Sequence, residues 1–444
     1  VGSLEAFLKQ GLESLVDLWQ MQRVLSNKFD PATNRSFLEA YTMGRGKALG
    51  GASSSSSSSS TQQQQQLLAA ADQPYALTLT LWNAICATLG GRLSTAFYKS
   101  ISLKNALVGH YPELARSLRA FVHLLQKETS HTSGVPSALP NYKSAASQLL
   151  RCVESYQNAF QQTSLNRMVE AVNILFSPNS RSLPTSSDMK RSIRCFFAEI
   201  STCTAAESGG DLVPACIANV AKAVRLMRER ADALMATGAE VKKVSGHCTA
   251  QQQRNIALCC RIQEVYTTLG LLAHKLDDQG ARDTLSNTLE SLKEVSSEAV
   301  APIFRSMLEM LEESIVHIQE ENFTKRGGSE SGDTVSIYLS DLLMKISHCR
   351  AEYLSKFKTE SSNRSIANEM VNSLITKLAG RVLEVYVEFA RKIRPEDGPG
   401  RTCLANDMKQ IEGAIGKALC PLESIGKPYE EFKAFREGLP LASP

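Results

Sequence analysis

Apolar residues in this sequence recur at alternating intervals of three and four positions, and this spacing restricts the fold more than any other feature. In residues 249–276 the spaced side chains are Leu258, Ile262, Val265, Leu269, Leu272 and Leu276. Because an α-helix has 3.6 residues per turn, they lie along one stripe of one helix. Thr249 and Gln252 form the pattern of a capping box at its start. Residues 371–393 repeat the spacing, and Pro395 marks the end of that helix.

The same spacing predicts helices over most of the chain. We expect them at residues 4–25, 77–97, 111–125, 143–161, 165–176, 185–201, 214–238, 281–322, 404–418 and 429–435. Thr185 to Asp188 are typical of a helix cap, and Gly238 is typical of a helix end. Pro302 predicts a kink or a break in the long helix at 281–322.

Strands are not predicted anywhere, because no run alternates apolar and polar residues between turn signals. A fixed repeat of about 34 or 40 residues is also absent, which disfavours tetratricopeptide and HEAT arrays. Long helices with short connections favour antiparallel bundles. The predicted fold is therefore all-α, an elongated rod of consecutive antiparallel helical bundles without a β-sheet.

One low-complexity tract interrupts the pattern. Residues 44–73 hold a Gly-rich stretch, a run of serines and a run of glutamines, which cannot bury enough apolar surface to fold. We expect a disordered insertion there. The predicted organisation is a first helical segment at 1–43, this insertion, and helical bundles at 74–208, 209–328 and 329–444.

Composition excludes several classes of protein. The 49 Lys and Arg residues nearly balance the 45 Asp and Glu residues, so a nucleic-acid-binding function is not expected. The 11 cysteines include no Cys-x-x-Cys pair, which favours a reducing compartment over a disulfide framework. No secretory signal pattern is visible at the start. The stretch 73–91 is the only candidate for a membrane span, and its Pro, Asn and Thr residues make it too polar.

Residues that bind metals in other proteins occur here in weak patterns. Glu128 and His131 form a single Glu-x-x-His pair, whereas a di-iron bundle needs two. Asp277, Asp278 and Asp283 are better explained as a loop between helices. A last candidate combines the neighbouring pairs His247–Cys248 and Cys259–Cys260. Adjacent helical residues point about 100° apart, so core cysteines are the preferred interpretation of Cys259 and Cys260.

Charged clusters are equally unspecific. Basic residues gather at Arg225, Arg228 and Arg230 and at Arg391, Lys392 and Arg394, and acidic ones at Glu309, Glu312, Glu313, Glu320 and Glu321. A solvated helix face explains each more simply than a binding patch. No phosphate-binding loop, dinucleotide fingerprint or nucleophile elbow is present. We therefore predict no catalytic residue, metal site or cofactor, and an interaction scaffold as the general class.

The succession of several segments resembles the family of the fifth subunit of the conserved oligomeric Golgi complex. Two of them are Pro-Thr-Ser-Ser-Asp at 184–188 and Gln-Arg-Asn-Ile-Ala at 253–257. The others, in the same order as in the family, are at 18–31, 81–84, 111–114, 155–160, 164–167, 172–176, 393–395 and 404–416. No single segment is specific, but their collinear order covers nearly the whole chain. The tract at 44–66 departs from the family as an insertion, and residues 277–282 and 325–333 are variable.

The resemblance implies a non-catalytic subunit of an eight-subunit complex that tethers vesicles at the cytosolic face of the Golgi. These vesicles return glycosylation enzymes between cisternae. The implied partners are the seventh subunit and other subunits, together with SNAREs, Rab GTPases and golgins. The resemblance also implies a central piece of a longer subunit, with a coiled-coil region before Val1 and helices after Pro444.

Two stretches are apolar enough on more than one side to be candidates for a subunit interface. They are residues 193–200 and 299–311. Burial on two sides inside a bundle explains both more simply. The alternatives to a tethering subunit are an unrelated cytosolic helical scaffold or vesicle adaptor, and an all-helical enzyme. An enzyme would need ionisable side chains inside a bundle, and the apolar stripes of the two best helices contain none.

Overall fold

The computed structural model of the chain describes residues 2–40, 76–130, 137–177, 182–205, 212–244, 246–323, 336–357, 369–393, 395 and 398–439. The regular structure in these ranges is helical and includes no strand; Phe29 and Ser36 form an isolated antiparallel bridge. The all-α prediction is confirmed. The predicted insertion at 44–73 lies outside the described residues.

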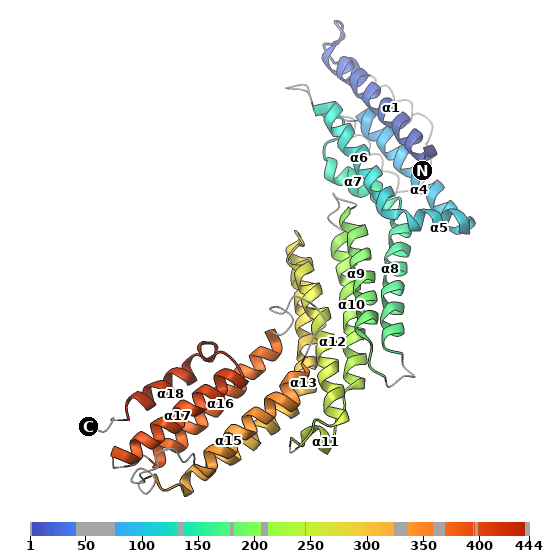
Figure 1. Cartoon of the computed structure of the whole chain (residues 1–444). Helices are drawn as coiled ribbons and strands as arrows, with labels where there is room; N and C mark the ends of the chain where they lie inside the picture. The colour runs from blue at the N-terminus through green and yellow to red at the C-terminus, as the bar shows by residue number, and fades with distance from the viewer. Residues whose placement is uncertain are drawn as a thin grey trace, which may run out of the picture. The chain divides into compact units, whose positions relative to one another are not determined.

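Two compact units make up the chain (Figure 1). The first comprises residues Val1–Ser164 and Glu199–Cys216, and the second comprises Leu165–Ala198 and Ile217–Pro444. The predicted division into bundles at 74–208, 209–328 and 329–444 stays a prediction.

Unit 1 is built on helices that pack through aromatic and aliphatic side chains. The helices are α1 (Gly2–Asn27), α4 (Ala76–Lys99), α5 (Ile101–Gly109), α6 (Tyr111–Ser130), α7 (Tyr142–Arg151) and the first part of α8 (Glu154–Leu175). Helix α6 contacts α1 and α7, and α1 contacts α4. Trp82 of α4 is fully buried and stacks on Phe121 of α6, with ring centroids 6.0 Å apart. This stacked pair contributes a large buried apolar area to the core of the unit.

Two features of unit 1 differ from the predictions. Helix α5 was not predicted; its start is capped by Ser100, whose Oγ accepts from the backbone N–H of Leu103 at 3.3 Å. The expected break between residues 161 and 165 is wrong, because α7 ends at Arg151 and α8 runs on without interruption. Cys152 in the break donates its thiol to the carbonyl of Cys86 and lies beside Gly90 of α4. Tertiary packing thus decided this helix end.

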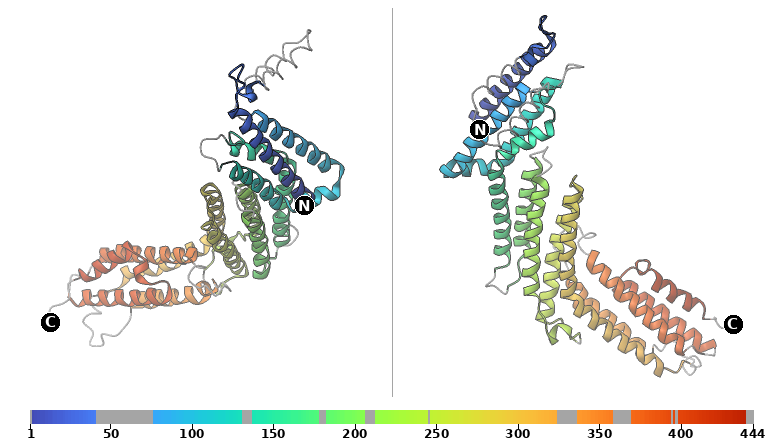
Figure 2. Two further views of the ribbon diagram at one scale, coloured as in Figure 1. Left: turned by 90° about the horizontal axis from the view of Figure 1, so that it is seen from above. Right: turned by 180° about the vertical axis from the view of Figure 1, so that it is seen from behind.

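Unit 2 holds the larger core. It contains parts of α8 and α9 (Ser186–Ala205), most of α10 (Leu212–Leu234), and α11 (Ala239–Lys242), α12 (Ala250–Ala273) and α13 (Gln279–Val316). Then follow a 3₁₀ turn (His317–Glu320), α15 (Ile337–His348), a π turn (Cys349–Tyr353), a 3₁₀ turn (Leu354–Lys356), α16 (Glu369–Ile393), α17 (Gly398–Ala418), a 3₁₀ turn (Leu422–Ser424) and α18 (Lys427–Glu437). Helices α15 to α18, orange to red in Figure 2, lie side by side.

The predicted helix starts at 185 and 249 and the end before Pro395 are confirmed. Helix α13 continues through Pro302, so a break there is wrong, and the ribbon instead changes direction within this helix (Figure 2). Residues 336–356 were not predicted to be helical, yet they form α15 and its two following turns.

Gly238 does not end α10, because that helix stops earlier, at Leu234. With a φ of 155°, Gly238 instead precedes the short α11. The carbonyl of Leu234 accepts the guanidinium of Arg254 of α12 at 3.0 Å. Because a side chain of another helix satisfies this terminal carbonyl, the sequence near Gly238 did not reveal where α10 ends.

Candidate functional site

The residues singled out as possible metal ligands take structural roles. Asp278 caps α13 by accepting the backbone N–H of Ala281 at 2.6 Å, and Asp283 accepts the side-chain amide of Gln279. The interpretation as a loop between helices is confirmed for Asp277 and Asp278, whereas Asp283 lies within α13. Glu128 is exposed, and its possible partner His131 lies outside the described residues. Among the residues that the structure describes, no three His, Cys, Asp or Glu side chains gather as a metal site would require.

Cys259 and Cys260 are both buried in the core of unit 2, as predicted for core cysteines. Burial raises the pKa of the Cys259 thiol to about 12 and that of Cys260 to about 11. Cys248 is also buried, whereas the side chain of His247 is 94% exposed and pairs with Glu352. The four residues therefore do not form the geometry of a zinc site.

The charged clusters lie on helix surfaces. Arg225 and Arg228 are exposed on α10, and Lys392 pairs with Glu388 at 3.1 Å one helical turn away. In the acidic run, Glu312 approaches Arg381 and Glu313 approaches Lys345, each at 3.8 Å. Arg394 lies outside the described residues. A solvated helix face remains the simplest explanation of these clusters.

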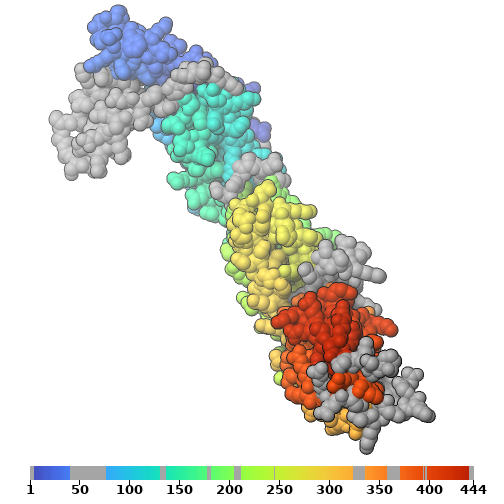
Figure 3. Space-filling view, turned by 90° about the vertical axis from the view of Figure 1, so that its left-hand side faces the viewer, coloured from blue at the N-terminus to red at the C-terminus, as the bar shows by residue number. Residues whose placement is uncertain are grey.

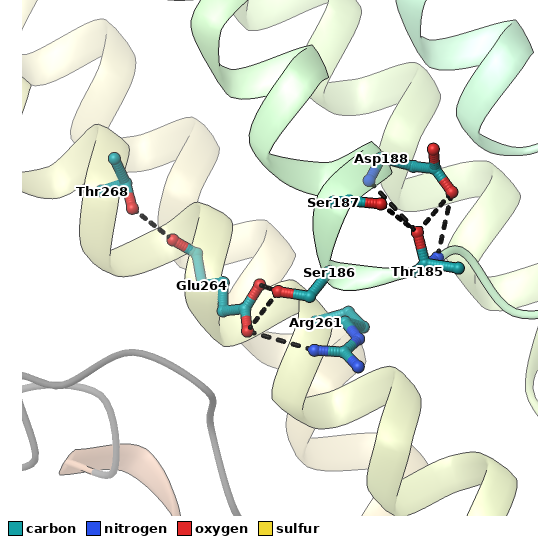
Figure 4. A network of polar contacts seen from close by, with 7 residues as sticks. All are labelled: Thr185, Ser186, Ser187, Asp188, Arg261, Glu264 and Thr268. Atoms are coloured by element: carbon teal, nitrogen blue, oxygen red, sulfur yellow. Dashed lines mark hydrogen bonds and ion pairs between the residues drawn. The ribbon is translucent and has the colours of Figure 1, made fainter.

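A polar cluster joins the start of α9 to the middle of α12, and its Ser186 and Glu264 are buried (Figure 4). Thr185 and Asp188 cap α9 reciprocally: the Thr185 hydroxyl accepts the Asp188 backbone N–H, and the Asp188 carboxylate accepts the Thr185 hydroxyl at 2.6 Å. This leaves Ser186 to donate to the carboxylate of Glu264, 3.2 Å away on α12. Arg261 pairs with the same carboxylate at 3.2 Å. We call Thr185, Ser186, Asp188, Arg261 and Glu264 the Glu264 cluster.

The hydrogen bond from Thr185 holds the pKa of the Asp188 carboxyl below its usual value of 3.8. Asp188 therefore stays ionised at the positive end of the α9 dipole, where a negative charge is stabilising. Glu264 is compensated by both an Arg and a hydroxyl, which a buried carboxylate needs.

A second buried cluster joins α15, α16 and α17. Asp407 of α17 is fully buried, and its carboxylate accepts the hydroxyl of Tyr338 at 2.8 Å and that of Ser336 at 3.1 Å. The hydroxyl of Tyr386 lies 3.0 Å from that of Tyr338. Burial, followed by the neighbouring Tyr386 and Asp407, raises the pKa of Tyr338. We call Ser336, Tyr338, Tyr386 and Asp407 the Asp407 cluster.

Asn255 makes a third junction in unit 2. Its side-chain oxygen accepts the backbone N–H of Ala236 at 2.8 Å, while its side-chain nitrogen donates to the carbonyls of Ala236 and Ala299 at 3.0 and 2.9 Å. One side chain thereby links α12 to α13 and to the segment after α10. Gln252 completes the predicted capping box with Thr249.

Unit 1 uses its polar residues in the same way. Gln22 of α1 accepts the backbone N–H of Thr78 at the start of α4, 3.2 Å away. Thr78 donates its hydroxyl to the carbonyl of Ala138 at 2.6 Å. The indole of Trp82 donates to the side chain of Gln148 of α7 at 2.9 Å. These bonds satisfy groups that burial would otherwise leave unpaired.

The segments that carry the family resemblance therefore supply many of the contacts between helices. Trp82, Thr185, Ser186, Asn255 and Asp407 all belong to those segments. Several of their partners, Gln148, Glu264, Ser336 and Tyr338, were missed, because each lies far away in the sequence. Glu264 lies away from the Leu258–Leu276 stripe on α12, so the spacing of that stripe gave no signal for it.

The two stretches proposed as interface candidates are largely buried inside the chain. In residues 299–311 the apolar side chains of Ala299, Val300, Ile303, Met307 and Leu311 are fully buried. In residues 193–200, Ile193, Phe196 and Ile200 are buried. The simpler explanation, burial inside a bundle, is confirmed. Large apolar side chains are exposed elsewhere, notably Tyr98 and Ile101 near the α4–α5 corner and Ile337 at the start of α15.

Helix α12 is long and apolar enough to cross a membrane, and it is the one such helix in the described ranges. The expectation that 73–91 is the only candidate was therefore wrong. The most apolar window of α12 has a mean hydropathy of 1.2, and 56% of this window is buried. Its buried Gln252, Asn255 and Glu264 all bond to neighbouring protein groups, as in the core helix of a bundle.

Comparisons with known proteins agree with the resemblance. Residues 2–122 match a family model described as conserved oligomeric Golgi complex subunit 5, C-terminal. Over 435 residues the chain is 27% identical to conserved oligomeric Golgi complex subunit 5 of Arabidopsis thaliana. This matched region covers 97% of the chain and 48% of that protein. It is 24% identical to the protein of the same name in Mus musculus over 82% of the chain and 46% of that protein. The chain thus spans about half the length of these relatives.

Proposed function

Because the chain is related over nearly its whole length to the fifth subunit of the conserved oligomeric Golgi complex, we propose that it is a non-catalytic subunit of that tethering complex. The observation that carries the proposal is the collinear similarity over 97% of the chain to the Arabidopsis thaliana subunit. In this role the protein supports retrograde transport of vesicles within the Golgi and the retention of glycosylation enzymes.

The use of polar residues supports a mechanical role. Asn255, Glu264 and Asp407 bond to groups on neighbouring helices, as an interlocked set of helices requires. A buried polar group without its partner costs about 1–3 kcal/mol, so each of these bonds favours one register of the helices. Fixed registers suit a subunit that holds other proteins at set positions.

The partners in this proposal are the seventh subunit and further subunits of the same complex, followed by SNAREs, Rab GTPases and golgins. The proposed location is the cytosolic face of the Golgi membrane, where the protein is held peripherally through the complex. The resemblance is the basis for each of these partners. An unrelated helical scaffold or vesicle adaptor is the alternative.

Co-purification is the direct test. The full-length protein, carrying an affinity tag, is expressed in cells of its own organism and isolated in mild detergent. We expect the seventh subunit to co-purify at a ratio near one to one, as identified by mass spectrometry. Recovery of intact, folded protein without any subunit of the complex would overturn the proposal in favour of the unrelated scaffold.

Loss of function gives the second readout. Depletion of the protein is expected to reduce terminal glycosylation at the cell surface, measured by lectin binding, and re-expression is expected to restore it. Unchanged lectin binding together with co-purification would retain the subunit assignment and refute the role in enzyme retention.

A further inference from the structure

A groove between α6 and α7 of unit 1 is lined by positive charge. Its cavity volume is about 580 Å³, and its basic side chains are Arg116, Arg119 and His123 of α6 and Lys143 of α7. None of the described residues that line it carries a carboxylate. Figure 3 shows the surface of these two helices, in teal, facing the viewer. A chain with nearly balanced charge has thus gathered charge of one sign in one hollow.

The spacing of residues along α6 produces this arrangement. Arg116, Arg119 and His123 follow one another at intervals of three and four, so they share one face of the helix. The opposite face carries Leu114, Leu118, Phe121 and Leu125, which are buried in the core. Lys143 lies in the first turn of α7, and the N-terminus of this helix adds partial positive charge. The hydroxyl of Tyr142 lies 2.6 Å from that of Thr129, which ties the two helices together at this end.

The floor of the groove is apolar. Val122, Leu124 and Ala146 line it, and Leu124 is 44% exposed although it is a large apolar side chain. One nitrogen of Arg119, Nη1, is buried and has no hydrogen-bond partner among the described residues. Basic side chains beside apolar ones are suited to a ligand that brings both a carboxylate and apolar side chains.

We propose that this groove binds an acidic amphipathic segment of a partner protein. Carboxylates of the segment would pair with Arg116, Arg119 and Lys143, and an apolar side chain of the segment would cover Leu124. A flat anionic membrane would contact exposed basic residues without needing a hollow with an apolar floor, so the geometry favours a peptide. The proposal rests on unit 1 alone and does not depend on membership in the tethering complex.

The test uses a synthetic peptide and the full chain. The probe is a fluorescein-labelled helix of about 20 residues that presents a stripe of Leu flanked by Glu, and its binding is measured by fluorescence anisotropy. A second peptide with Lys in place of every Glu is the probe control. We expect saturable binding of the acidic peptide that weakens as salt is raised, and no binding of the basic peptide.

Three variants locate the binding site. The double variant Arg116→Glu with Lys143→Glu is expected to weaken binding of the acidic peptide at least about tenfold, because electrostatic attraction becomes repulsion. Leu124→Ser is expected to weaken binding of the acidic peptide by a smaller factor and to leave the salt dependence of binding unchanged. Arg225→Glu with Arg228→Glu on exposed positions of α10 is the control with the same change of charge, and it is expected to change the affinity less than twofold. Circular dichroism checks that each variant stays folded.

Three results would overturn the proposal. The first is equal loss of binding in the α6–α7 and α10 variants, which would mean unspecific attraction. The second is saturable binding of the peptide that the α6–α7 charge reversal leaves unchanged. The third is the absence of peptide binding while the chain sediments with vesicles containing phosphatidylinositol 4-phosphate in a manner that the charge reversal abolishes, which would assign the groove to a lipid headgroup.

Discussion

Helices α9 and α15 both begin at a serine that donates to a buried carboxylate, but the two starts are built differently. At α9, Thr185 and Asp188 cap the helix, and Ser186 in the first turn is left to bond Glu264. At α15, Ser336 stands in the capping position but bonds Asp407 instead of its own helix. The first start combines a local cap with a tertiary contact, whereas the second depends on the tertiary contact alone.

The surroundings of the two carboxylates differ as well. Glu264 pairs with Arg261, whose side chain remains 21% exposed, so water shares in stabilising this ion pair. Asp407 is fully buried and accepts the hydroxyls of Ser336 and Tyr338. Because hydrogen bonds are stronger and unpaired groups more costly away from water, we expect the Asp407 cluster to matter more for stability. Substitutions at both sites can test this comparison.

The largest effect is expected from Asp407→Ala, at about 3 kcal/mol of local stability, because it removes the acceptor of the buried Ser336 and Tyr338 hydroxyls. The free energy of opening of α15 and α17, measured by native-state hydrogen exchange, checks it. Asp407→Asn keeps an acceptor oxygen and should lose less. A loss below that of Glu264→Ala would refute the ranking of the two clusters.

Glu264→Ala is expected to cost about 2 kcal/mol, measured by the same exchange experiment in α9 and α12. Ser186 then loses its acceptor, but Arg261 can turn toward water. Glu309→Ala, at an exposed position of α13, is the control and should stay within about 0.5 kcal/mol of the unchanged chain. Equal losses at Glu264 and Glu309 would mean that the Glu264 cluster does not hold α9 against α12.

The Asp407 cluster should also be sensitive to alkaline pH. The pKa of Tyr338 is raised in the folded chain, whereas an unfolded tyrosine titrates near 10.0. Above that pH the unfolded chain releases a proton that the folded chain retains, so stability falls as pH rises. The limiting slope for one such group is about 1.4 kcal/mol per pH unit. Tyr338→Phe should remove this slope from thermal unfolding measured between pH 9 and 11, and an unchanged slope would contradict the assignment.

The smallest expected effect is at the α9 cap. Thr185→Ala removes the capping hydroxyl and is expected to cost about 1 kcal/mol, measured by hydrogen exchange in the first turn of α9. Thr185→Ser keeps the hydroxyl and serves as the control. If both variants behave alike, the cap contributes through backbone conformation and not through its hydrogen bond.

This cap should be sensitive to acid. Its hydrogen bonds hold the pKa of Asp188 below 3.8, so their contribution is present above that pH and is lost as pH falls through the folded value. Asp188→Asn is expected to flatten this acid loss in thermal unfolding scans. The α9 start would then weaken in acid and the Asp407 cluster in alkali, which separates the two sites experimentally.

The same comparison shows how far the sequence could be interpreted. The start of α9 was predictable because Thr185 and Asp188 lie three residues apart and cap the helix between themselves. Helix α12 was predictable for the same reason, through Thr249 and Gln252. Helix α15 was missed because Ser336 has Leu339 three residues later in place of an acid or amide. Its partner Asp407 stands 71 positions away, where no local pattern can indicate it.

The candidate surface shows a similar limit. The basic residues of α6 could have been placed on one helix face from their spacing alone. Lys143 joins them only because α7 packs beside α6, and the apolar floor is exposed only because no described helix covers Leu124. The more compact basic clusters of α10 and α16 were therefore more apparent in the sequence than the basic face of α6.

The sequence by itself determined the all-α fold class, most of the helices and the family resemblance, because periodic apolar positions, caps and collinear segments are local or ordered along the chain. Tertiary structure alone decided where α7 and α10 end, how α15 begins and which polar residues meet. Those features depend on hydrogen bonds between residues far apart in sequence. Such bonds gain their free energy only when packing removes both groups from water.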